Sequence, residues 1–335
     1  MAPLGSTANL NTMTRRLLLT CVAALLTTLA TGACKKKEEA AAGGGTHVKL
    51  ALNWVAEPEF GGFYAAREGG AYRKRSLDVE IQGGGAGVPV VQMVAGGQAD
   101  FGIVGADELL TARARGADVL PVFATFQTSP QGIMAHASRG AKNIGDVLKG
   151  GTLALEPGAP YAVFLAKKFG FQHVSIVPYD GGIARFLVDP NVAQQCYVTA
   201  EPLAARKNGG DPQVFLVADE GFNPYVGVLI VSRKTWTEHP DRVRAFVEAS
   251  REGWTSYNAD PKPTNAVMRK VNASMDDATF AEAAAAQRPL TESADTQAHG
   301  LGSMTRDRWE TLGKQLVELG IVDKAPAVAE FLVVP

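Results

Sequence analysis

The stretch LNWVAEPEFGGFYAAREGGAY, residues 52–72, joins the end of an apolar, strand-like run to a helical pattern. A bulky aromatic residue, Trp54, and two carboxylates, Glu57 and Glu59, stand at the junction, and a glycine pair follows them. In open α/β sheets, ligands bind outside the carboxyl ends of the strands. The stretch therefore predicts a strand-to-helix unit whose connecting loop faces a ligand site.

The same alternation of strand and helix patterns continues along most of the chain. Strands separated by helices of this length form right-handed βαβ crossovers and mainly parallel sheets. After the last strand pattern the spacing becomes helical, starting at Pro240 and ending before Gly320, a typical C-terminal cap. We therefore predict an α/β protein with two α/β units and a helical tail. Strands are expected at residues 48–52, 77–82, 101–104, 119–126, 132–136, 151–155, 174–179, 193–198, 213–218 and 226–232.

Two apolar, β-branched runs stand at the ends of the two units, GIMAH (132–136) and VGVLIVS (226–232). We expect both to cross between the units, because two crossings form a hinge and a hinge between two lobes forms a cleft that closes on a ligand. Lobe one is expected over residues 47–133 and lobe two over residues 134–227. A return crossing and C-terminal helices follow over residues 228–335.

The N-terminus has the pattern of an export signal. Two adjacent arginines precede an apolar run that ends in small side chains, and the run is short for a membrane span. Residues 1–33 are therefore predicted to be a signal peptide, with Met1 or Met13 as the start. The folded part is expected to be exported to the periplasm or the cell surface.

Cys34 follows the small residues of the signal and is predicted to be lipidated as the first mature residue. Thr31 stands where such signals usually carry an aliphatic residue, and an ordinary secreted protein cut near Ala33 is the alternative. The run KKKEEAAAGGG after Cys34 has no apolar period and is typical of a flexible tether. Residues 34–46 would thus hold the folded part at a membrane.

Composition argues against several classes of function. The formal net charge is −1, and the lack of a basic cluster beyond the tether argues against a nucleic-acid partner. Cys196 is the one cysteine after Cys34, so no internal disulfide is expected. The histidines have no metal-binding spacing, and GGGAG (83–87) lacks the Lys-Ser/Thr of a phosphate loop. We expect a monomer without a catalytic constellation, cofactor or metal site.

Several motifs resemble the solute-binding proteins of ABC importers for nitrate, taurine and other sulfonates, and thiamine pyrimidine precursors. These motifs are LNW with GGFYAAREGGAYRKRSLDVEIQGGGAG, followed by VQMVAGGQADFGIVGADELLTARARG. QQCYVTAEPLAARKNGG, ADEGFNPYVGVLIVSRKTWTEHPDRVRAFVEASREGW and GLGSMTRDRWETLGKQLVELGIV are most similar to the thiamine-precursor branch. The resemblance runs from residue 48 to the C-terminus. It implies a type II periplasmic-binding-protein fold whose C-terminal helices complete lobe one, with an ABC permease and its cytoplasmic ATPase as partners.

A related fungal enzyme uses the same fold to make the thiamine pyrimidine, consuming its own histidine and requiring a cysteine-rich motif. In this sequence Phe60 stands where that histidine would be, and Cys196 is the only cysteine in the folded part. We therefore expect a binding protein and not a synthase.

The predicted strand ends supply the candidate ligand-binding residues. In lobe one the candidates follow the carboxyl ends of the first three predicted strands. In lobe two they are acidic and tyrosine side chains near the carboxyl ends of its predicted strands. The candidates are Asn53, Trp54, Glu57, Gly84, Gly85, Asp107, Glu156, Tyr161, Tyr197, Glu201 and Tyr225.

Each candidate has a structural alternative. Trp54 is alternatively a core aromatic residue beneath the cleft, and the three tyrosines are alternatively packing residues. Asp107 and Glu201 are alternatively carboxylates that stabilise the first turn of a helix. Because Glu57 and Glu59 alternate, we expect one to face inward and the other to be a solvated loop charge.

The character of these residues indicates the class of ligand. Receptors for sulfonate or nitrate need hydrogen-bond donors, usually Arg, and none of the strand ends carries Lys or Arg. Carboxylates accept hydrogen bonds from amino groups, and aromatic faces stack on flat rings. The prediction is a planar, nitrogen-rich, neutral or cationic ligand such as an aminopyrimidine. The alternative is an anion held by the backbone amides of residues 83–85.

Overall fold

The structure is a computed structural model that describes residues 45–335. The predicted signal peptide, Cys34 and nearly all of the predicted tether lie outside these residues. In the part of the chain from residue 45 onward, no helix is both long enough and apolar enough to cross a membrane.

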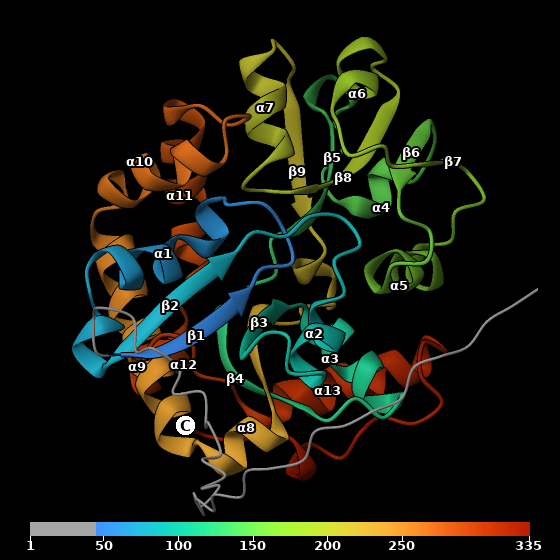
Figure 1. The fold of residues 1–335 in the computed structure, drawn as a ribbon. Coiled ribbons are helices and arrows are strands. Elements are labelled where there is room, and N and C mark those ends of the chain that lie inside the picture. Colours follow the sequence, from blue (N-terminus) through green and yellow to red (C-terminus); the bar gives the residue numbers. More distant parts are fainter. Residues whose placement is uncertain (1–44) are drawn as a thin grey trace, which may run out of the picture. The chain divides into compact units, whose positions relative to one another are not determined.

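The first sheet has the strand order β2-β1-β3-β10-β4 (Figure 1). β1, β2 and β3 are parallel, whereas β10 is antiparallel to both β3 and β4. The bounds of these strands are β1 (Thr46–Ala51), β2 (Leu77–Gln82), β3 (Phe101–Val104), β4 (Val119–Phe126) and β10 (Val226–Ser232).

The second sheet repeats this plan with the order β7-β6-β8-β5-β9. β6, β7 and β8 are parallel, and β5 is antiparallel to β8 and β9. The bounds are β5 (Gln131–His136), β6 (Thr152–Leu155), β7 (Ser175–Pro178), β8 (Val192–Tyr197) and β9 (Pro212–Leu216).

The chain passes between the sheets twice, through residues 127–130 and residues 217–225. β5 and β10 are the first strands after these passages, and each lies wholly in the sheet that it enters. The first passage therefore precedes the expected boundary at residue 133. A strand that arrives from another sheet needs no crossover helix, so it can pair antiparallel within an otherwise parallel sheet.

Helices cover the strands of both sheets. In lobe one they are α1 (Gly61–Glu68), α2 (Val90–Ala95) and α3 (Ala106–Ala114), preceded by the short 3-10 turn η1 (Pro58–Phe60). In lobe two they are α4 (Ile144–Val147), α5 (Pro160–Phe169), α6 (Ala184–Val188) and α7 (Glu201–Lys207). The C-terminal helices are α8 (Arg233–Glu238), α9 (Pro240–Ala259), α10 (Lys262–Val271), α11 (Asp277–Thr291), α12 (Ala294–His299) and α13 (Arg306–Glu318).

The glycine pair after Glu59 lets α9 approach α1 closely (Figure 1). A Cβ at Gly61 would lie 2.2 Å from the Tyr257 ring, and one at Gly62 would lie 2.1 Å from the Trp254 ring. Both rings are almost fully buried against α1. α9 therefore packs on α1 of the first sheet, and small residues at this contact are a steric requirement.

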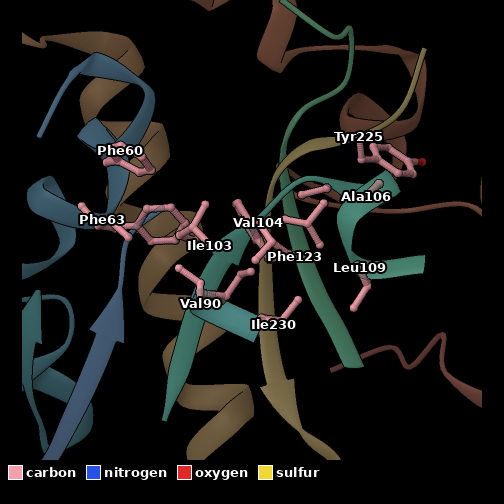
Figure 2. Packing of buried hydrophobic residues seen from close by; sticks show 14 of the residues in the cluster. Phe60, Phe63, Val90, Ile103, Val104, Ala106, Leu109, Phe123, Tyr225 and Ile230 are labelled. Atoms are coloured by element: carbon pink, nitrogen blue, oxygen red, sulfur yellow. The ribbon is translucent and has the colours of Figure 1, made fainter. Parts of the chain in front are cut away.

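A continuous apolar cluster packs the first sheet against its helices and extends into the second sheet, and Figure 2 shows Phe60, Phe63 and Ile103 among its members. Phe63 packs edge-on against both Phe123 of β4 and Trp254 of α9, with ring centroids 6.1 and 5.8 Å apart. Rings in this arrangement gain stability beyond their buried area. The core therefore holds the β1–α1 connection, which carries Trp54 and both glutamates, against a rigid support.

Candidate functional site

A cavity of about 290 Å³ is lined by residues from both sheets. Its lobe-one side comes from the loop after β1, from Ile103 of β3 and Phe126 of β4, and from the first two residues of β10. Phe60 and Ile103 also belong to the core, so the core of lobe one forms part of the cavity wall. The lobe-two side comes from the ends of β6, β7 and β8. The cavity therefore lies at the carboxyl ends of strands from both lobes, where α/β folds bind ligands.

Six of the candidate residues line this cavity. Trp54 is 42% exposed, so it is not the core residue of the alternative interpretation. The six are Asn53, Trp54, Glu57, Glu156, Tyr197 and Glu201.

Two other candidates are packing or connecting residues. Tyr225 is buried, its hydroxyl accepts a hydrogen bond from the backbone N–H of Thr305 at 3.0 Å, and Arg308 lies 3.8 Å from its ring centroid. Tyr161 is also buried and donates its hydroxyl to Gln195. Tyr225 is therefore a packing residue in this structure, and Tyr161 contacts the cavity lining through Gln195.

The remaining three candidates are also absent from the cavity lining. Gly84 donates its backbone N–H to the Trp54 carbonyl at 2.9 Å, and neither Gly84 nor Gly85 is among the lining residues. The amides of residues 83–85 do not begin a helix either, because α2 starts only at Val90. Asp107 lies in the first turn of α3 and lines a second cavity with Glu108 and other residues.

Glu57 and Glu59 both line the cavity, so the expectation that only one of them faces inward is wrong. The chain turns through η1 here instead of continuing as a strand, and the alternation of a strand does not apply. Burial and the charge of Glu201 raise the pKa of Glu57 to about 7, and a hydrogen bond with Trp54 acts in the opposite direction. Burial and the charges of Glu57 and Glu201 raise the pKa of Glu59 to about 8.

Glu201 is a fixed acceptor on the lobe-two side. Its Oε1 accepts a hydrogen bond from the Tyr179 hydroxyl at 2.6 Å, and its Oε2 accepts one from the backbone N–H of Tyr197 at 2.8 Å. It is also the first residue of α7, where the helix dipole favours a negative charge. Glu201 therefore both begins α7 and lines the cavity.

The electrostatic character of the cavity follows from its complete lining. Four glutamates are among the lining residues, and none of the lining residues is Lys, Arg or His. Carboxylates that crowd in a partly desolvated space favour bound cations, protons or hydrogen-bond donors.

Some lining residues were not among the sequence candidates, above all Gln195 and Gln131. Gln195 lies two residues before Tyr197 on β8, so the two-residue period of a strand could have indicated it. Gln131 begins β5 and lies opposite Tyr197 in the register, a pairing that local sequence does not reveal. Cys196 is buried, and its burial raises the pKa of its thiol well above the usual value.

The sequence profile of the NMT1/THI5-like family matches residues 57–264, more than half of the chain. The chain belongs to this family. Among curated proteins, the riboflavin-binding protein RibY of Chloroflexus aurantiacus is 26% identical to this NMT1/THI5-like chain over 225 residues. That match covers 64% of this chain and 63% of RibY, just under two thirds of the relative's length.

Solved structures resemble this NMT1/THI5-like protein over most of its length. The periplasmic aliphatic sulphonate binding protein SsuA of Escherichia coli superposes with a TM-score of 0.65 at 16% identity, covering 86% of this chain and 92% of SsuA. The desulfurization enzyme DszB gives a TM-score of 0.60 at 14% identity, covering 86% of this chain and 96% of DszB. These likenesses confirm the predicted periplasmic-binding-protein fold. Because the fold occurs in both binding proteins and an enzyme, function has to be argued from the cavity.

Proposed function

We propose that this NMT1/THI5-like protein is the solute-binding component of an ABC importer, and that its two lobes close on a small, planar, nitrogen-rich ligand. The observation that carries the proposal is the lining of the cavity between the sheets, which has four glutamates and no basic side chain. The ligand is neutral or cationic, and an aminopyrimidine such as a thiamine pyrimidine precursor is the class that we favour.

The chemistry of the lining supports this class of ligand. An ionised carboxylate only accepts hydrogen bonds, so in that form Glu57, Glu59 and Glu201 fit amino groups and protonated ring nitrogens. The raised pKa values of Glu57 and Glu59 favour their protonated forms in the empty cavity, and a cationic ligand would shift both toward the ionised form. Trp54 and Tyr197 offer aromatic faces on which a flat ring can stack. RibY, a relative described as riboflavin-binding, is consistent with a flat nitrogen heterocycle as ligand.

A sulfonate or nitrate is the alternative ligand, because SsuA has the same fold. Oxyanion sites usually supply arginine, and such a ligand would meet like charge from the glutamates here. The lining therefore favours the heterocycle over the anion.

Binding without catalysis is the second part of the proposal. Cys196 is among the lining residues, but its side chain packs with Met134, Phe186 and Ala205 on the face of β8 opposite Gln195 and Tyr197. A raised pKa also keeps its thiol protonated and weakly nucleophilic. No histidine is present in the lining to act as its base. Among residues 45–335 there is also no cluster of three or more side chains suited to hold a metal ion.

The location and partners complete the proposal. Residues 1–33 would direct export, and Cys34 would anchor a monomeric protein to the membrane through a lipid. An anchored receptor delivers its ligand to a permease driven by a cytoplasmic ATPase. Metabolic labelling with a radioactive fatty acid tests the anchor, because Cys34→Ala should abolish the label and release the protein.

A thermal-shift screen of the purified protein tests the ligand class, since a ligand that binds only the folded state raises Tm. The panel holds aminopyrimidines, thiamine, riboflavin, nucleobases, taurine, alkanesulfonates and nitrate. A rise in Tm with a nitrogen heterocycle supports the proposal. A rise with sulfonates or nitrate alone would contradict the proposed ligand class.

A further inference from the structure

We infer that Gln195 presents a fixed hydrogen-bond donor to the cavity, and that the ligand therefore carries an acceptor on the edge that faces β8. This inference rests on the proposed function, because it assumes that the cavity holds a ligand. It narrows the proposed ligand from any planar, neutral or cationic nitrogen compound to a ring that has an acceptor beside its donors.

The orientation of the Gln195 amide follows from its partners. The backbone N–H of Glu156 lies 2.7 Å from the side-chain atom assigned as Oε1, and a backbone N–H can only donate. That atom must therefore be the oxygen and not the nitrogen of the amide. The Tyr161 hydroxyl donates to the same oxygen. Tyr161 is thus a positioning residue that helps to lock the amide.

With its oxygen occupied by two donors, Gln195 has its NH₂ group left for the cavity. Gln195 is partly exposed and lines the cavity, and its Nε2 has no hydrogen-bond partner among residues 45–335. Gln131 differs, because its Nε2 already donates to the carbonyls of Gly132 and Cys196, each at 3.3 Å. Gln195 is therefore the better placed of the two amides to donate to a ligand.

An acceptor stands near this donor on the same wall. Gln195 and Tyr197 are two residues apart on β8, so they point to one face of the sheet about 7 Å apart. Glu201 is held against the backbone N–H of Tyr197. The wall thus offers both a donor, Gln195, and an acceptor, Glu201. A ring nitrogen or carbonyl beside an amino group complements this pair, whereas a simple amine satisfies only Glu201.

Two six-membered aromatic amines test the inference, namely 4-aminopyrimidine, whose two ring nitrogens are acceptors, and aniline, whose ring has none. Both are flat and carry one amino group, and both are uncharged in mildly alkaline buffer. We expect the wild-type protein to bind 4-aminopyrimidine about tenfold more tightly in calorimetry, the effect of a hydrogen bond that would otherwise leave a buried donor unpaired.

Variants assign this preference to Gln195. Gln195→Glu keeps the acceptor for Glu156 and Tyr161 but turns the donor into an acceptor, so it should abolish the preference, and Gln195→Met should do the same without adding charge. Gln194→Met is the matched control, since Gln194 is buried on the other face of β8 and bonds to the Gly182 carbonyl. Tyr161→Phe should reduce the ratio of the affinity for 4-aminopyrimidine to the affinity for aniline. A merely structural role of Tyr161 would instead lower both affinities by the same factor.

The outcomes separate this inference from the proposed function. Equal wild-type affinity for the two probes, or a preference retained in Gln195→Met, would overturn the inference and leave the proposed function standing. If only a larger heterocycle of the panel binds, the same variants are tested on it, and an unchanged affinity in Gln195→Met overturns the inference. Binding of no heterocycle would overturn the proposed function and the inference together.

Discussion

Glu59→Gln should stabilise the ligand-free protein at alkaline pH while weakening its binding of a cationic heterocycle. The pKa of Glu59 rises from 4.5 to about 8 because of burial and the charges of Glu57 and Glu201. A carboxyl with a raised pKa in the folded state destabilises that state whenever it is ionised. The cost is absent below about pH 4.5, grows as the pH rises, and is complete above about pH 8.

The size of the effect follows from the pKa. One pKa unit corresponds to about 1.4 kcal/mol, so the full rise would correspond to about 5 kcal/mol. Glu59 is only partly buried and faces a cavity open to water, which screens the charge and reduces the cost to on the order of 2 kcal/mol. For a protein of this size we expect Tm to rise by about 3–5 °C at pH 9 in the Gln variant.

Thermal unfolding of both proteins across the pH range measures this difference. The two melting temperatures should converge near pH 4.5 and diverge steadily toward pH 9. Glu282→Gln is the control, because this glutamate is exposed on α11 and should leave Tm nearly unchanged throughout. A stabilisation that does not vary with pH, or none at pH 9, would refute the electrostatic reasoning.

Three further predictions concern the cavity wall, the helix contact and an exposed ion pair. Trp54→Ala should weaken heterocycle binding in calorimetry by about 1–3 kcal/mol, with little change in Tm because Trp54 is 42% exposed; unchanged affinity would remove it from the site. Gly62→Ala should lower unfolding stability by about 1–3 kcal/mol in denaturant melts through overpacking, whereas Gly85→Ala, with open space around it, should not. Lys207 of α7 forms an exposed ion pair with Asp276 at the start of α11, so Lys207→Ala should lower unfolding stability by less than about 1 kcal/mol in denaturant melts; a larger loss would contradict this.

The crowding of carboxylates explains why a substitution that stabilises the ligand-free protein is expected to weaken its binding of a cationic ligand. Glu57 and Glu59 have raised pKa values partly because Glu201 on the other lobe repels them. A ligand that supplies positive charge or donors relieves this repulsion as the lobes close. Functional sites commonly retain such local instability, which substitution can remove at the expense of function.

Sequence alone determined the elements and their order, because hydrophobic periodicity is a local property. The strand predictions for residues 77–82, 101–104, 119–126 and 226–232 coincide with β2, β3, β4 and β10. Trp54 and Glu57 were found because a side chain just after a buried strand must lie at the edge of the sheet.

Only the tertiary structure decided which polar side chains meet. The turn η1 brings Glu59 inward beside Glu57, although alternation predicted the opposite. Tyr161, Tyr197 and Tyr225 were equal candidates from the sequence. In the structure Tyr161 bonds to Gln195 and Tyr225 bonds to Thr305, and neither is in the cavity lining. These differences depend on contacts between residues far apart in the chain, and local patterns carry no information about such contacts.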